Sequence, residues 1–294
     1  MSEPQVSPML TPAEMARAAE DAAHAKVTGK SLKSFMLGLT GGGYIALGFV
    51  FYLTLQVGAE TMPYGVAKFL GGLVFSTGLA LVVLTGAELF TSSTLTLTAR
   101  ASGRISWGQL LTNWGIVYGA NFLGALTIVA LIFVGGTWHN ANDAWGAVVL
   151  STAQGKMHHT FVEAFVLGIL CNLMVCLAVW AAFAGRTVTD KVVAVTLPIA
   201  LFVASGFEHC VANMFLIPLA VLIKGTADAE FWATTGLGED AFAGLTIPDF
   251  LVHNLVPVTL GNIIGGGVMI GIFYWTVFRR FDRSAPAPES GGHS

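Results

Sequence analysis

Long apolar stretches, separated by short polar segments, dominate the chain. We place them near residues 35–57, 65–99, 110–134, 157–183, 189–223 and 250–278. A membrane-spanning helix needs about 20 apolar residues, so each stretch is long enough to cross a bilayer. The pattern predicts an all-α integral membrane protein whose six transmembrane spans occupy residues 35–280.

Small and polar residues interrupt the second and fifth stretches, which are too long for one simple helix. The interruptions lie at residues 85–93, which read TGAELFTSS, and 205–213, which read SGFEHCVAN. Each places an ionisable side chain where a charge costs roughly 2.5–3.5 kcal/mol. Because non-helical backbone persists at membrane depth only inside protein or along a cavity, both breaks should point inward.

The two halves of the apolar region resemble each other. Gly86-Ala87-Glu88 matches Gly206-Phe207-Glu208 at an offset of 120 residues. An offset of 141 residues pairs Asn113 and Asn121 with Asn254 and Asn262. Three spans per half is an odd number, so the halves should form two inverted repeats. Inverted repeats place the pathway of a transporter or channel at the repeat interface.

Composition supports a membrane protein. Hydrophobic residues make up 54% of the chain and charged residues 11%, against about 25% charged in a soluble domain. The net charge of −3 suggests no nucleic-acid partner. The odd number of cysteines and the lack of a CxxC pair favour small buried apolar side chains over a disulfide or metal site. No cofactor and no metal are expected.

Polar segments flank the apolar region. Residues 1–34 should form a cytoplasmic amphipathic helix, from about 11 to 33, with a capping box at Thr11, Pro12 and Glu14. This arm either packs on the membrane face or serves as a gate or a docking site for a cytoplasmic partner. No cleavable signal peptide is visible. Residues 281–294 should form a disordered cytoplasmic tail.

Positive charges gather in alternate connections, which predicts that both termini are cytoplasmic. The last outer loop is acidic instead. The basic residues that set this orientation are Arg17, Lys26, Lys30, Lys33, Arg100, Arg104, Arg186, Lys191, Arg279, Arg280 and Arg283.

Opened helices favour an anion in the cavity between them. The pieces after the breaks, about 93–99 and 209–223, start near the middle of the membrane. A helix N-terminus carries free amides and partial positive charge, and two such ends aimed at one cavity attract negative solutes. The C-terminal ends of the preceding pieces oppose this effect.

His209 is the one imidazole in the two breaks. It is either a central pore histidine that donates to, or protonates, a passing anion, or a structural histidine tied to the loop backbone. Thr91 lies in the matching break and is positioned to hydrogen-bond the anion. Glu88 and Glu208 would repel an anion, so we interpret them as caps that accept loop amides, with Asn213 in a similar role.

Apolar and polar wall residues surround the breaks. The aromatic and leucine side chains either pack in the core or towards lipid, or form constrictions that strip water from a solute. Such constrictions favour a weak acid that takes up a proton over a permanently charged ion. Asn172 is a polar lining candidate. Lys156 either draws anions into the outer vestibule or snorkels at the interface. The constriction candidates are Phe75, Leu79, Leu89, Phe90, Phe202 and Phe207.

The motifs TGAELFTSS at 85–93 and GFEHCVANM at 206–214 resemble the formate/nitrite transporter family, formate-channel branch. Asn254, the PVTLGN run at 257–262 and Gly265 to Gly267 are similar to its last helix. The resemblance covers about residues 12–280. It implies an aquaporin-like protomer in a homopentamer of the inner membrane, with His209 at the pore centre and Thr91 as its partner.

The resemblance also implies that Val175 joins Phe75, Leu79, Leu89, Phe90 and Phe202 in the constrictions, and that Asn172 and Asn262 line the path. It implies bidirectional, pH-dependent passage of formate, and an arm that binds the formate-producing enzyme.

Other functions remain open at this point. A channel for nitrite or hydrosulfide would share the same motifs. A water- or glycerol-type channel for neutral solutes would share the architecture. An intramembrane enzyme would use Glu88, Glu208 and His209, but the HExxH and GxSxG motifs are absent, so the chain is not expected to be an enzyme.

Overall fold

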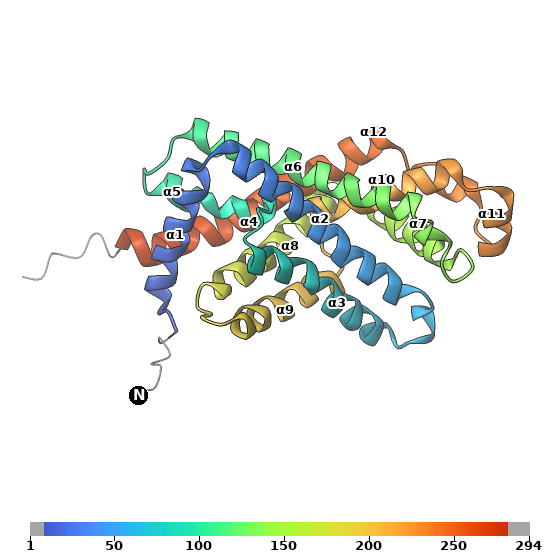
Figure 1. Ribbon diagram of the computed structural model, residues 1–294, viewed down its shortest axis with the longest axis horizontal. Helices are drawn as coiled ribbons and strands as arrows, with labels where there is room; N and C mark the ends of the chain where they lie inside the picture. Colours follow the sequence, from blue (N-terminus) through green and yellow to red (C-terminus); the bar gives the residue numbers. More distant parts are fainter. Residues whose placement is uncertain (1–8, 282–294) are drawn as a thin grey trace, which may run out of the picture.

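The computed structural model describes residues 9–281 and contains helices without any strand in that range. Figure 1 shows an elongated bundle with α1 at one end and α11 at the other. The main helices are α1 (Pro12–Thr28), α2 (Ser31–Gln56), α3 (Tyr64–Thr85), α6 (Trp107–Val134), α7 (Ala144–Met157), α8 (Phe161–Ala182), α9 (Val188–Ala204), α10 (Cys210–Thr226) and α11 (Ala229–Thr235).

Shorter helical pieces complete the chain. After α3, the chain continues through α4 (Phe90–Ser93), a 3-10 turn (Thr94–Thr96) and α5 (Leu97–Ala101). The last long helix alternates α and π turns. It contains α12 (Ile247–Asp249), η5 (Phe250–Leu255), α13 (Val256–Asn262), η6 (Ile263–Ile272), α14 (Phe273–Trp275) and η7 (Thr276–Arg280).

Five helices are long and apolar enough to cross a membrane: α2, α3, α6, α8 and the one within Glu239–Arg280. A sixth arises if α10 and α11, bent by 116°, count as one span. The predicted fifth span is instead two helices of 17 residues each, α9 and α10, separated by residues 205–209. The all-helical membrane architecture is therefore confirmed, and the count of six crossings stays a prediction.

Glycines let helices approach closely within each half. A side chain at Gly42 of α2 would overlap the backbone of Asn121 in α6, and one at Gly124 would overlap Leu39. In the second half, Gly261 and Gly265 of the last helix meet the backbone of α8 in the same way. Small residues at helix contacts are typical of membrane bundles, where close packing replaces the hydrophobic effect between helices.

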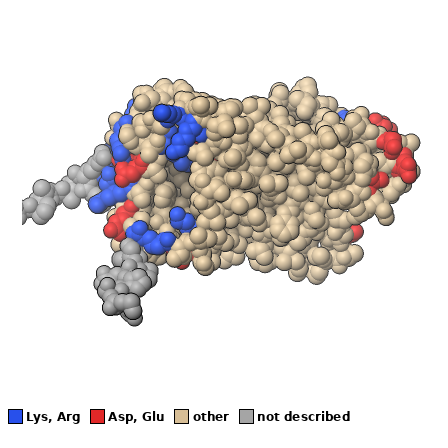
Figure 2. All heavy atoms as spheres, viewed as in Figure 1, with Lys and Arg blue, Asp and Glu red and all other residues tan. Residues whose placement is uncertain are grey.

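Charged side chains gather at the two ends of the bundle. Figure 2 shows Lys and Arg together with some Asp and Glu at the end where α1 lies, mainly Asp and Glu at the far end, and a largely uncharged band between them. Large apolar side chains are exposed along this band, among them Leu131, Val134, Leu197 and Phe273. An uncharged apolar belt fits a lipid-facing surface. Cys171, Cys176 and Cys210 are buried and free, as the sequence predicted.

The N-terminal arm is α1, docked on the basic end of the bundle. The predicted capping box at Thr11 and Glu14 is confirmed. The helix ends at Thr28, earlier than the predicted residue 33, because Gly29 and Lys30 adopt extended backbone, and α2 starts at Ser31 rather than 35. Residues 282–294, including the predicted disordered tail after Phe281, lie outside the described range.

Ion pairs hold the arm in place. Glu20 is buried and accepts from Arg104 at 3.3 Å and from Arg279 at 2.9 Å. Asp21 accepts from Arg104 at 2.5 Å. The alanine face of α1 packs against Leu95, Trp180 and Ile270. The arm is thus tied both to the connection after the first break and to the last helix.

Candidate functional site

Two opened helices form the centre of the molecule. The helix α3 ends at Thr85, and Gly86 takes the left-handed conformation at φ 74°. The backbone is extended at Leu89 and helical again from Phe90. The same sequence of events follows α9, with Gly206 at φ 72° and a restart at Cys210. Glycine suits both positions because it adopts positive φ without steric cost.

Both predicted breaks are confirmed, although they are shorter than predicted. The non-helical segments cover residues 86–89 and 205–209. The pieces that follow begin at Phe90 and Cys210, so the second part of each predicted interruption is already helical. Thr91, Ser93 and Asn213 therefore lie on helical turns.

One asparagine seals each break. The side-chain oxygen of Asn121 accepts the amide of Phe90 at 2.7 Å, while its amide donates to the carbonyls of Glu88 at 2.9 Å and Gly38 at 2.7 Å. These contacts satisfy backbone groups that a broken helix leaves unpaired.

Asn262 does the same in the second half. Its oxygen accepts the amide of Cys210 at 3.0 Å, and its amide donates to the carbonyls of Glu208 at 3.0 Å and Gly168 at 2.7 Å. The internal repeat read from the sequence therefore extends to individual hydrogen bonds. Asn262, predicted to line the path, uses its side chain to hold the loop.

His209 sits between the two breaks and is buried, with 2% of its surface exposed. Its Nδ1 accepts the backbone amide of Ala212 at 3.1 Å, capping α10. Its Nε2 lies 3.1 Å from the hydroxyl of Thr91. Because Nδ1 accepts, the proton of the neutral ring lies on Nε2, which donates to Thr91. The two interpretations of His209, backbone anchor and pore group, thus apply to different nitrogens.

Asn172 joins this centre from α8. Its side-chain amide donates to the carbonyl of Thr91 at 3.0 Å and to the carbonyl of Asn262 at 2.6 Å. The residue is fully buried. Asn172 therefore links the helix that carries Thr91 to the last helix, which positions the hydroxyl of Thr91 against the imidazole.

The two glutamates do not accept loop amides. Glu88 accepts from the hydroxyl of Ser34 at 3.0 Å. Glu208 accepts from the ammonium of Lys156 at 2.6 Å and from the side-chain amide of Asn213 at 2.7 Å. The loop amides of both glutamates bond instead to carbonyls in α2 and α8. The carboxylate of Glu208 is held by side chains from two helices, whereas the second oxygen of Glu88 is buried without a hydrogen-bond partner among the described residues.

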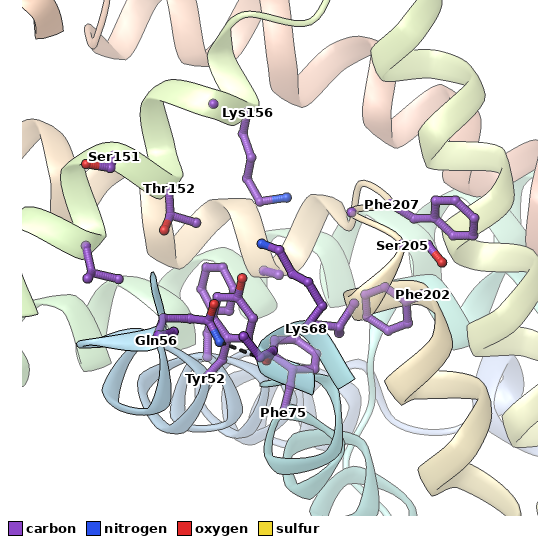
Figure 3. Close-up of a pocket in the computed structure, with 18 of the residues that line it drawn as sticks. Tyr52, Gln56, Lys68, Phe75, Ser151, Thr152, Lys156, Phe202, Ser205 and Phe207 are labelled. Carbon is purple, nitrogen blue, oxygen red and sulfur yellow. Dashed lines mark hydrogen bonds between the residues drawn. The ribbon is translucent and has the colours of Figure 1, made fainter. Parts of the chain in front are cut away.

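A cavity of about 940 Å³ leads from one end of the bundle to this centre. Figure 3 shows Lys68 and Lys156 projecting into it above Phe75 and Phe202. The rings of Phe75 and Phe202 meet edge to face at 5.7 Å between centroids, and Phe202 stacks on His209 at 5.9 Å. These rings and His209 line the inner end of the cavity, which we call the outer cavity.

Four of the other constriction candidates do not line the outer cavity. They are buried: Leu79, Leu89, Phe90 and Val175. The ring of Phe90 packs against Tyr118 at 4.7 Å. Phe207 lines the outer cavity.

A second cavity of about 320 Å³ opens at the arm end of the bundle, lined by Lys26, Ser34 and Asn113 among others. From the sequence, Lys26 entered only the prediction of orientation, and neither Ser34 nor Lys68 of the outer cavity was identified. The available signal was its spacing, because Lys68, Phe75 and Leu79 recur on one face of α3.

Known proteins resemble this chain over nearly its whole length. A model of the formate/nitrite transporter family matches residues 13–276. The formate channel FocA of Escherichia coli strain K12 is 52% identical over 272 residues, which cover 92% of this chain and 95% of that protein. FocA of Haemophilus influenzae is 52% identical over 264 residues, covering 90% and 93%. A solved pentameric formate channel with formate bound matches with a TM-score of 0.81 at 50% identity, covering 84% of this chain and 97% of that one.

Proposed function

The chain belongs to the formate/nitrite transporter family, and from this premise we propose that it is a channel for formate and related small monovalent anions, working in both directions. The observation that carries the proposal is the buried pair of Thr91 and His209. The pair joins the two opened helices at the inner end of the outer cavity, behind an aromatic layer.

The aromatic layer forms an energy barrier to the passage of an ion. A formate ion that passes Phe75 and Phe202 must leave water, and an unpaired charge in an apolar environment is strongly disfavoured. A polar group immediately behind the layer lowers this barrier. There the Nε2–H of His209 donates to the hydroxyl oxygen of Thr91 over 3.1 Å, and the hydroxyl hydrogen of Thr91 is a second donor at the same place.

Neutral His209 is the form that the hydrogen bonds favour. A doubly protonated ring would direct Nδ1–H at the amide N–H of Ala212, which also needs an acceptor. Hydrogen-bond donation from Nε2 to formate exchanges the bond to Thr91 for one to the anion and leaves the cap of α10 intact. Proton transfer to formate needs an imidazolium, so it also needs the cap of α10 to open. Protonation of formate by His209 therefore costs the bond to Ala212. Because the ring must first take up a proton, this route makes the flux pH-dependent.

The assembly, location and partner follow from other observations. The similar solved channel is described as pentameric, and the apolar belt of this chain leaves room for neighbouring protomers. We propose a homopentamer in the inner membrane with both termini in the cytoplasm, supported by the basic residues at the α1 end. The exposed side of α1 is the proposed contact for the cytoplasmic formate-producing enzyme. The protein is proposed to transport without catalysis.

Formate flux across a pH series tests this function. Purified protein is reconstituted in liposomes, and radiolabelled formate uptake is measured between about pH 5 and pH 8. Wild type should show flux that changes with pH, and H209N and H209A should alter this dependence. The matched control is His139→Asn, because His139 lies on an exposed turn and pairs with Asp143. Equal flux for wild type and H209A at every pH would refute the role of His209.

A further inference from the structure

Two lysines reach the outer cavity, and the structure gives them different surroundings. The ammonium of Lys156 lies 2.6 Å from Oε1 of Glu208, whose side chain is 1% exposed. The other oxygen of Glu208 accepts from Asn213 at 2.7 Å. The positive charge of Lys156 is thus compensated within the protein, and a solute in the cavity meets an ion pair rather than a free cation.

Among residues 9–281, no carboxylate lies within salt-bridge distance of Lys68. The contact of its ammonium in that range is the ring of Tyr64, whose centroid is 5.7 Å away. The lysine is half-buried, and Tyr64 is 76% exposed. A half-buried ammonium that lacks a counter-ion carries unsatisfied donors, and an oxyanion is the ligand that satisfies them.

The position of Lys68 places it on the route to the centre. Lys68 precedes Phe75 by seven residues on α3, which is two helical turns or about 10 Å. Residues spaced by seven share one face of a helix. Figure 3 shows Lys68 projecting into the same space as Lys156. A solute held by Lys68 would therefore wait in front of the aromatic layer.

Other charged and polar groups of the outer cavity do not neutralise Lys68. Glu60 lines the cavity from its exposed rim, where water screens it. His159 lies 3.8 Å from Oε1 of Glu208 and competes with Lys156 for that oxygen. The amide of Gln56 donates to the carbonyl of Ala67 at 3.3 Å. Among the described residues that line the outer cavity, Lys68 is therefore the lysine whose charge is not compensated by a carboxylate.

We propose that Lys68 is the anion-binding residue of a vestibule site in the outer cavity. The site holds a small monovalent oxyanion, a carboxylate or a sulfonate, about two helical turns before the aromatic layer. Its natural occupant, formate, rests on the proposed channel function. The site itself depends on the charge of Lys68 and on the aromatic walls of Phe49, Tyr52 and Phe207.

A bulky monoanion isolates this site from transport. Benzenesulfonate carries one permanent charge and an aromatic ring, so it matches the lysine and the walls. It cannot become neutral by taking up a proton near neutral pH, and it is too wide to pass between the packed rings of Phe75 and Phe202. It should therefore bind in the outer cavity and block formate without crossing.

Binding is measured by calorimetry on the purified full chain, and block by adding benzenesulfonate outside cells that express the channel and take up labelled formate. K68M should weaken both binding and block about tenfold, as expected for the loss of a charge-assisted contact. K68R keeps the charge and should stay within about threefold of wild type. The control is Lys33→Met, an exposed lysine on the first turn of α2.

The outcomes separate the site from the channel function. Unchanged affinity in K68M, or no saturable binding to wild type, would overturn the site even if formate flux is normal. Binding that depends on Lys68 in a protein without formate flux would support the site and overturn the channel function. K68R and size-exclusion chromatography show whether a weak binder is still folded.

Discussion

Thr91 and His209 come from different breaks, 118 residues apart in sequence, and meet through a hydrogen bond of 3.1 Å. Few side-chain hydrogen bonds cross between the halves at this level, and Asn172 supplies another by binding the carbonyl of Thr91. The relative position of the two opened helices therefore depends on a small number of polar contacts.

Removing the hydroxyl of Thr91 should lower formate flux in a protein that still folds. T91V keeps the side-chain volume but leaves Nε2–H of His209 without its acceptor, which costs about 1–3 kcal/mol. We expect at least a tenfold loss of flux in liposomes, and T91S should retain most of it. Thr127→Val is the control, because the hydroxyl of Thr127 bonds to its own helix. Equal flux in T91V and wild type would contradict the role of the hydroxyl.

The asparagine seals should determine stability. N262A leaves the amide of Cys210 and the carbonyl of Glu208 unpaired in a buried place, and removes a second bond to the carbonyl of Gly168. These unsatisfied groups at about 1–3 kcal/mol each should cause severe destabilisation. Thermal unfolding in detergent measures it, with N121A as the parallel variant and the exposed Asn140→Ala as the control. Matching unfolding temperatures for N262A and N140A would rule out the seal.

The pair of Lys156 and Glu208 should show strong coupling. K156M leaves a buried carboxylate with its amide donors alone, and loss of one partner of a buried pair costs roughly 3–5 kcal/mol. The double variant K156M/E208Q removes both charges and should recover much of the stability. A double-mutant cycle on unfolding free energy gives the coupling. Additive effects of the two substitutions would show that the pair is not coupled.

The arm should detach in acid. Burial opposes the charge on Glu20, but hydrogen bonds from Arg279, Ser102 and Arg104 outweigh it, so the pKa of Glu20 lies below its ordinary value. A lowered pKa in the docked state means that docking is favoured above the pKa of the free carboxyl and is lost as pH falls through the docked pKa. The protection of α1 amides from hydrogen exchange, corrected for the intrinsic pH dependence of exchange, should therefore fall in acid.

E20Q isolates this effect. The substitution removes the titrating group, so the protection of α1 should be weaker than in wild type at neutral pH and should change little on acidification. Glu14→Gln is the comparison, because Glu14 lies on the exposed first turn of the same helix. Protection of α1 in wild type that is independent of pH would contradict the ionic docking.

The sequence predicted those features that depend on local pattern. The apolar runs indicated the long helices, and Gly86 and Gly206 marked the breaks because few residues tolerate the left-handed conformation there. The capping box at Thr11 followed from three residues. His209 stood out because an imidazole is rare in an apolar run.

Features that depend on which helices meet were beyond the sequence pattern. The partners of Glu88 and Glu208 are Ser34 and Lys156, distant by 54 and 52 residues, and neither distance follows any helical period. Asn172 and Asn262 were predicted to line the path, and both are buried. Their pairing with backbone carbonyls rather than with a solute depends on the close approach of α8 and the last helix. Lys68 was not identified from the sequence, because only the fold shows the cavity that it lines.

Asn121 and Asn262 hold the backbone of each break and do not bond to the side chains of residues 89 and 209. Each asparagine draws all its backbone partners from its own half of the chain. The residue that corresponds to His209 at the offset of 120 is Leu89. Duplication of an ancestral three-helix unit would thus preserve the same backbone scaffold in both halves and leave residues 89 and 209 free to diverge. The two halves therefore share a scaffold, and only the second carries an imidazole at the centre.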